Sequence, residues 1–87
     1  MYVIVVYDVS VKRVNRICQY LRRYLNWIQN SVFEGELSKS MLEEIRVGIK
    51  KIINKNEDSI RIYILPSDKP LKREVIGIEK VELGNVI

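Results

Sequence analysis

The stretch that decides the fold is residues 2–8, Tyr-Val-Ile-Val-Val-Tyr-Asp. Its run of β-branched and aromatic residues predicts a buried β-strand. Asp8 ends this strand, where the backbone leaves the sheet and a side chain can face a ligand. A carboxylate there offers oxygen to a hard cation such as Mg²⁺. The alternative is that Asp8 caps the following helix or closes a turn.

Positive charge is concentrated directly after Asp8. Residues 1–33 hold five basic residues against one acidic residue, whereas residues 34–87 hold ten of each sign. The five have no Glu at helical spacing with which to pair. They are Lys12, Arg13, Arg16, Arg22 and Arg23. Such a one-signed cluster predicts contacts with nucleic-acid phosphates, and the alternative is a solvated helix face.

The composition restricts the chemistry. The chain has no histidine, so catalytic triads that need imidazole are excluded and a structural zinc site lacks ligands. Carboxylate and metal chemistry remains. The single cysteine, Cys18, falls on the apolar face of a predicted helix, where we expect a small buried hydrophobe. The apolar runs are too short to span a bilayer and resemble no cleavable leader, so we expect a cytoplasmic protein without membrane contact.

Hydrophobic periodicity predicts the order of the secondary structure elements. A helix runs from an N-cap at Ser10 to about residue 25. A second helix covers about residues 39–53, and its start is indicated by Ser38 and by Ser40, the latter in a capping-box arrangement with Glu43. Two short strands lie within residues 26–37, with a bulge or close backbone approach at Gly35. Residues 59–65 alternate as a further strand. Residues 74–78 and 81–87 are apolar enough for strands as well.

This order, strand-helix-strand-strand-helix-strand, is that of the ferredoxin-like split βαβ unit. We therefore expect an α+β fold, with two helices on one face of an antiparallel sheet and an extra C-terminal strand, in a single domain over residues 1–87. The other face and one sheet edge are left open. A chain of 87 residues also has a thin core. We therefore expect a homodimer, with the region of about residues 74–87 in the contact.

Four blocks of sequence resemble the CRISPR-associated Cas-two family. They are Tyr7-Asp8-Val9-Ser10, Asn15-Arg16, the segment Gln29–Leu37 around Ser31-Val32-Phe33-Glu34-Gly35, and Asp58–Tyr63. The resemblance implies a ferredoxin-like homodimer described as a metal-dependent endonuclease on RNA or DNA. It also implies action with the Cas-one integrase in the acquisition of new spacers, which is part of antiviral defence.

The resemblance also implies roles for individual residues. The family's metal-binding carboxylate falls on Asp8, its neighbouring aromatic on Tyr7, and further site residues on Arg16 and Phe33. Ser31 lies beside them as a nucleic-acid contact. The chain departs from the family pattern in two ways: the loop after Asp8 lacks further acidic residues, and Trp27 stands where many members have a basic residue. Core packing of Tyr7 and Phe33 is the alternative to a catalytic role.

The mechanism predicted from these residues uses two copies of the chain. One carboxylate is too few to fix Mg²⁺, so we expect a single ion shared by Asp8 of both protomers. Arg16, with Arg13, would balance negative charge that develops on the phosphate. The competing hypothesis is a non-catalytic dimeric scaffold that binds DNA for the Cas-one integrase and in which Asp8 is structural.

Overall fold

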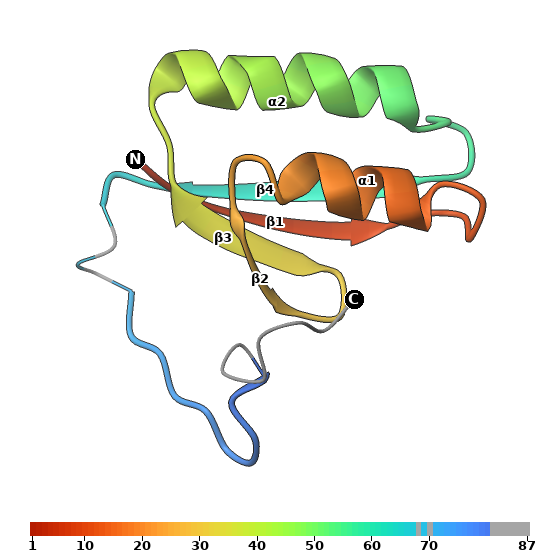
Figure 1. The fold of residues 1–87 in the computed structure, drawn as a ribbon. Coiled ribbons are helices and arrows are strands. Elements are labelled where there is room, and N and C mark those ends of the chain that lie inside the picture. Colours follow the sequence, from red (N-terminus) through yellow and green to blue (C-terminus); the bar gives the residue numbers. More distant parts are fainter. Residues whose placement is uncertain (68, 70, 81–87) are drawn as a thin grey trace.

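A four-stranded antiparallel sheet carries both helices on one face in the computed structural model, which describes residues 1–67, 69 and 71–80 (Figure 1). The elements are β1 (Tyr2–Asp8), α1 (Val14–Leu21), β2 (Asn26–Gln29), β3 (Val32–Glu36), α2 (Lys39–Ile52) and β4 (Ser59–Leu65). The strand order is β2-β3-β1-β4. This arrangement confirms the predicted ferredoxin-like βαββαβ fold. Within the described part of the chain, neither helix is long and apolar enough to cross a membrane.

Strand β1 lies in the middle of the sheet and alternates between its two faces. Val3, Val5 and Tyr7 are buried, because successive side chains of a strand point to opposite faces and this set faces the helices. The other set begins at Tyr2 and ends at Asp8, which is exposed. Asp8 therefore faces the open side of the sheet, away from both helices.

The core fills the space between β1 and the two helices. α1 contributes Ile17, Cys18 and Leu21, and α2 contributes Leu42, Ile45 and Ile49. Each of these residues is at most 3% exposed. Burying an aliphatic side chain of this kind contributes roughly 1.5–3 kcal/mol. The predicted burial of Cys18 is confirmed, with 2% of the residue exposed.

α1 begins later and ends earlier than predicted, since it covers only Val14–Leu21, whereas α2 begins at Lys39 as predicted. Ser10 caps no helix: its carbonyl accepts from Arg13 N at 2.8 Å and its Oγ from Lys12 N at 3.3 Å, so residues 10–13 form a turn and α1 starts only at Val14. α2 is capped by Ser38 rather than Ser40, since Ser38 Oγ accepts from Met41 N at 3.2 Å. The Ser38 hydroxyl thus satisfies one of the first free N–H groups of α2, whereas the N-cap of α1, Arg13, makes no side-chain cap hydrogen bond.

Gly35 has the close contact that the sequence predicts. A Cβ placed there would lie 3.2 Å from Leu25 Cδ2, so the absent side chain lets the chain before β2 pack against β3. The irregularity in strand pairing lies instead in β2, where the register shifts between Trp27 and Gln29.

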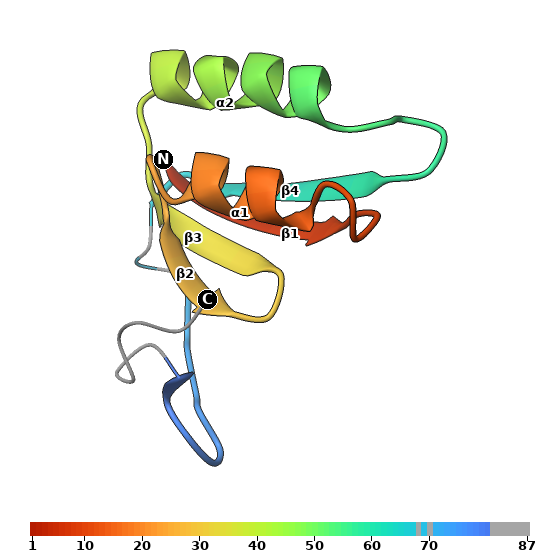
Figure 2. The same cartoon turned by 45° about the vertical axis from the view of Figure 1, so that its right-hand side comes forward.

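The C-terminal segment differs from the prediction. Residues 74–78 form no strand, and the predicted strand over residues 81–87 lies outside the described residues. Arg73 pairs with Glu34 of β3, and Gly77 has φ +103°. These features direct the segment across the open face, beyond the sheet on the side opposite the helices (Figure 2), rather than along a strand edge. A strand needs such an edge for its hydrogen bonds.

Candidate functional site

Asp8 stands at the C-terminal end of β1, on the open face of the sheet. Its Cα pairs with that of Ser59 at the start of β4. The carboxylate makes no hydrogen bond or ion pair with the residues that the structure describes, and the residue is exposed. A single accessible carboxylate of this kind is suited to an external cation rather than to holding the fold. The sequence-based alternative, a helix cap, is wrong because the N-cap position of α1 is Arg13.

Tyr7 and Phe33 lie on the opposite face of the sheet from Asp8. Their ring centroids are 6.2 Å apart with 28° between the ring planes, and the residues are 5% and 0% exposed. Burial, followed by the nearby Cys18 thiol, raises the pKa of Tyr7 to about 12. The structure thus brings the two predicted aromatics together as part of the core. Their catalytic role stays a prediction, and no surface of Phe33 is open to a substrate.

Ser31 is placed beside the end of β1 by the turn between β2 and β3. Its carbonyl accepts from Tyr7 N at 3.1 Å. Asn30, the turn residue before it, has φ +42°, a left-handed conformation that asparagine tolerates. The turn therefore lies next to β1 just before Asp8. The nucleic-acid contact of Ser31 stays a prediction.

Arg13 has two carboxylate partners. Its Nε donates to Asp58 Oδ2 at 2.6 Å and its Nη2 to Glu57 Oε1 at 2.7 Å. Its side chain is only 17% exposed. A guanidinium held in this way has little capacity left for a phosphate. Sequence reasoning placed Arg13 with the phosphate contacts and missed Asp58, because the two residues are 45 positions apart.

Arg16 and Arg23 lie together on the helical side of the molecule. They border a surface cavity of about 420 Å³ that is also lined by Gln19 and Tyr20 of α1 and by Ile52 of α2. The Arg23 guanidinium lies 5.8 Å from the centre of the Tyr20 ring. The predicted interleaving of an aromatic with cations is thus present. The cavity does not include Asp8, which points to the other side of the sheet, so the predicted proximity of Arg16 to Asp8 has no support in this geometry.

The remaining predicted phosphate contacts, Lys12 and Arg22, are both exposed. Lys12 lies in the turn between β1 and α1, and Arg22 is the C-cap of α1. They therefore stand at opposite ends of the helix.

Arg61 is a cation on the face of Asp8 that sequence reasoning did not assign to the site. In β4 it pairs with Val6, while Ser59 pairs with Asp8. Arg61 is therefore the diagonal cross-strand neighbour of Asp8 on one face, within reach of a long side chain. It is also exposed. The signal was available in the alternation of β4, which separates Arg61 and Tyr63 from the isoleucines of that strand.

A metal site would be incomplete in one copy of this chain. No three acidic or cysteine side chains converge anywhere in the described residues. Asp8 fits Mg²⁺ as one oxygen ligand, but Mg²⁺ is held by one or two carboxylates only together with waters or substrate phosphates. The residues of a single chain therefore supply half of a site at most.

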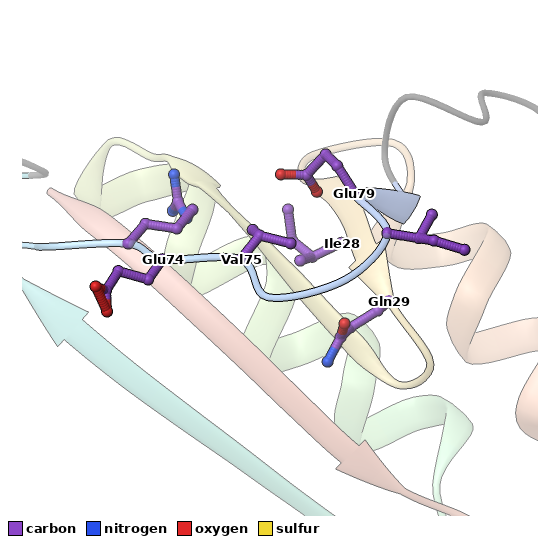
Figure 3. Close-up of a pocket in the computed structure, with 7 residues that line it drawn as sticks. Ile28, Gln29, Glu74, Val75 and Glu79 are labelled. Atoms are coloured by element: carbon purple, nitrogen blue, oxygen red, sulfur yellow. The ribbon is translucent and has the colours of Figure 1, made fainter.

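A cavity of about 410 Å³ lies between β2 and the C-terminal segment (Figure 3). Ile28 and Gln29 line one side, and Glu74, Val75 and Glu79 line the other. None of the predicted site residues borders it. The cavity is therefore separate from Asp8 and from the helical cavity that holds Arg16.

Comparisons with known proteins test the resemblance noted in the sequence. The family model described as CRISPR associated protein Cas2 matches residues 1–73. A protein of Archaeoglobus fulgidus named CRISPR-associated endoribonuclease Cas2 2 is 60% identical over 80 residues, which cover 92% of this chain and 87% of that protein. The CRISPR-associated endoribonuclease Cas2 of Pyrococcus furiosus is 53% identical over 87 residues, the full length of both chains.

Solved structures agree with these matches. A crystal structure of Cas2 superimposes with a TM-score of 0.86 at 50% identity, covering 100% of this chain and 98% of that one. Streptococcus pyogenes Cas2 gives a TM-score of 0.79 at 31% identity, covering 88% of this chain and 100% of that one. Sequence and fold lead to the same assignment, and the chain belongs to the CRISPR-associated Cas2 family.

Proposed function

We propose that this chain is a cytoplasmic, metal-dependent endonuclease that cleaves RNA phosphodiester bonds in a CRISPR system. The observation that carries the proposal is the exposed Asp8 carboxylate, which ends the central strand and makes no hydrogen bond or ion pair with the described residues. The relatives named above as endoribonucleases support RNA as the substrate. Fold alone would not, since one fold hosts many functions.

A second copy of the chain would complete the site. Tyr63 and Ile64 of the edge strand β4 are each 47% exposed, and Ile76 of the C-terminal segment is 98% exposed. Pairing between copies would cover these side chains and the free edge of β4. A two-fold axis near the ends of the β1 strands would then bring two Asp8 carboxylates together.

The chain's own residues would orient the substrate and balance its charge. Two Asp8 carboxylates would hold one Mg²⁺, which when bound polarises a phosphoryl oxygen and lowers the pKa of water. Arg61, on the same face as Asp8, is placed to neutralise phosphate charge at the reacting group. Arg16 and Arg23 would contact phosphates further along the strand, from the helical side.

The test compares Asp8→Asn with the wild-type protein. Labelled single-stranded RNA and duplex DNA are incubated with each protein, with Mg²⁺ or with a chelator. We expect Asp8→Asn to lose Mg²⁺-dependent RNA cleavage while keeping its thermal unfolding midpoint and its dimer, because the amide keeps the shape and loses the charge. The matched control is Glu57→Gln, which removes an exposed carboxylate elsewhere. Undiminished cleavage by Asp8→Asn would overturn the proposal.

The competing function is a non-catalytic dimeric scaffold that binds DNA for the Cas-one integrase. The placement of Arg16 and Arg23 on the helical side favours it, because binding there needs nothing from Asp8. The scaffold hypothesis predicts that the wild-type protein binds duplex DNA and cleaves neither substrate. It also predicts that Asp8→Asn binds duplex DNA as tightly as wild type does. The same cleavage assay, followed by a duplex-binding titration, therefore separates the two functions.

A further inference from the structure

A second aspartate lies buried behind the end of β1. The Asp58 side chain is 0% exposed and accepts hydrogen bonds from two loops. Ser10 N donates to Oδ1 at 2.8 Å and Asn54 N to Oδ2 at 2.9 Å. Arg13 donates twice, from Nε at 2.6 Å and from Nη2 at 3.2 Å. One carboxylate therefore joins the β1–α1 loop to the α2–β4 loop.

These contacts hold the backbone that follows Asp8 and the start of the strand that pairs with it. Ser10, whose N–H the carboxylate holds, follows Asp8 by two residues. Asp58 itself precedes Ser59, the residue that pairs with Asp8 across the sheet. The direction in which the chain leaves β1, and the strand opposite Asp8, thus depend on the same side chain.

The interaction between the Asp58 carboxylate and the Arg13 guanidinium is an ion pair as well as a set of hydrogen bonds. The Arg13 guanidinium, helped by the two backbone N–H groups, holds the pKa of Asp58 well below its usual range. An asparagine at this position would keep the shape but lose the charge, and its NH₂ would face a donor of Arg13 or of the backbone. At least one of the four hydrogen bonds would then be lost, and the loop after Asp8 would be held less tightly.

We propose that Asp58, paired with Arg13, is a positioning residue that holds the Asp8 carboxylate for metal binding and phosphodiester cleavage. This inference rests on the proposed function. A ligand to a metal must be held within about 0.5 Å of its productive position, and removal of a supporting hydrogen-bond partner typically costs roughly 10–100-fold in metal affinity or activity. A merely structural role would change stability without changing metal affinity in the folded protein.

The experiment uses Asp58→Asn with Glu57→Gln as the matched control. Glu57 also pairs with Arg13, but its side chain is 54% exposed and it touches neither Ser10 nor Asn54. Mn²⁺ binding to the full-length protein is followed by electron paramagnetic resonance below the unfolding temperature, and kcat and KM are measured on single-stranded RNA. We expect Asp58→Asn to weaken Mn²⁺ binding and lower kcat by roughly tenfold or more, with KM unchanged. Glu57→Gln should stay within about twofold of wild type in both readouts, since the contacts to Ser10 and Asn54 persist.

Each outcome has a defined meaning. The inference would be overturned if folded Asp58→Asn had the Mn²⁺ affinity and the kcat of wild type. It would also be overturned if Asp8→Asn bound Mn²⁺ as tightly as wild type does. If the wild-type protein binds Mn²⁺ through Asp8 but cleaves no RNA, the proposed nuclease function is contradicted. The Mn²⁺ titration of Asp58→Asn would still decide whether Asp58 positions Asp8. If Asp58→Asn does not fold, Arg13→Lys serves instead. Lysine keeps the positive charge but cannot donate two hydrogen bonds to Asp58 as arginine does. Arg13→Lys should therefore show smaller decreases in Mn²⁺ affinity and kcat than Asp58→Asn. Wild-type Mn²⁺ affinity and kcat in Arg13→Lys would overturn the inference.

Discussion

Tyr7 stacks on Phe33 beneath the helices, with 6.2 Å between the ring centroids, while the next residue, Asp8, faces the other side of the sheet. The alternation of one strand thus separates the aromatic pair from the carboxylate. The resemblance grouped these residues in one site. In the folded chain the rings support the strand from which Asp8 projects, and only Asp8 is open to a ligand.

We expect Phe33 to stabilise the fold rather than to take part in cleavage. Phe33→Ala would leave a cavity in the core, and we expect it to lower the free energy of unfolding by about 3–5 kcal/mol. Phe33→Leu should cost about 1 kcal/mol, because it keeps most of the apolar volume. Urea denaturation measures both values. RNA cleavage by Phe33→Leu should match wild type under folding conditions, and a folded but inactive variant would show instead that the ring contacts substrate.

The protein should lose stability in strong alkali because of two tyrosines. Burial raises the pKa values of Tyr7 and Tyr20 from 10.0 to about 12, and the Tyr20 hydroxyl also donates to the Glu44 carbonyl at 2.9 Å. Between these pH values the unfolded chain releases protons that the folded chain keeps. The stability that these two tyrosines contribute is therefore fully present below pH 10 and is lost as the pH rises through about 12.

Denaturant midpoints measured across this pH range check the alkaline prediction. Tyr7→Phe should show a shallower decline than wild type, because it removes one of the two titrating groups. Ultraviolet absorbance of tyrosinate gives an independent reading of ionisation in the folded state. The same slope in Tyr7→Phe and wild type would mean that Tyr7 ionises equally in the folded and unfolded chain.

Arg16 and Arg23 should behave alike in nucleic-acid binding, and Arg13 should differ from both. Alanine at position 16 or 23 should reduce the slope of log affinity against log salt by roughly 0.9 on duplex and 0.7 on single strands. Arg13→Gln should leave the slope unchanged, because its guanidinium is held by Asp58 and Glu57. Binding titrations at several salt concentrations measure these slopes. An altered slope for Arg13→Gln would restore Arg13 to the phosphate contacts predicted from the sequence.

Cleavage rates at saturating RNA extend this comparison. Arg16→Ala and Arg23→Ala should both keep the wild-type rate, since their shared cavity lies on the side of the sheet opposite Asp8. A rate lowered by Arg16→Ala alone would instead support the catalytic role that the family resemblance implies for Arg16.

Dimer formation should depend on Ile76. This residue is 98% exposed and contributes almost nothing to packing within its own chain. Ile76→Asp should therefore leave thermal unfolding of the single chain unaltered while placing a charge in the contact between copies, which weakens association. Sedimentation velocity at micromolar concentration measures the change. Val47→Asp is the matched control, since Val47 is 49% exposed on α2, on the helical side of the sheet. A wild-type dimer fraction in Ile76→Asp would exclude Ile76 from the contact.

Local periodicity was sufficient to predict the elements of residues 2–65 and their faces, but it also predicted a strand over residues 74–78 that does not form. Alternation in residues 2–8 distinguishes the buried side chains from those on the open face, and the helical spacing around Ile17 and Ile45 predicts the core stripes that the structure confirms. The residue at which α1 begins did not follow from the local pattern. Ser10 has the residue type of an N-cap, yet its N–H is bound by Asp58, a partner that no local pattern reveals.

The sequence by itself determined the βαββαβ order, the position of Asp8 at the end of a buried strand, and the excess of positive charge after it, because each depends on residues that are close neighbours along the chain. Only the tertiary structure decided which of those charges are available. It pairs Arg13 with Asp58 across 45 residues, sets Arg61 beside Asp8 through strand register, and places Arg16 on the opposite layer. These pairings depend on how loops and strands that are distant in the sequence meet in space. The same local sequence pattern is compatible with several such pairings, so it does not decide among them.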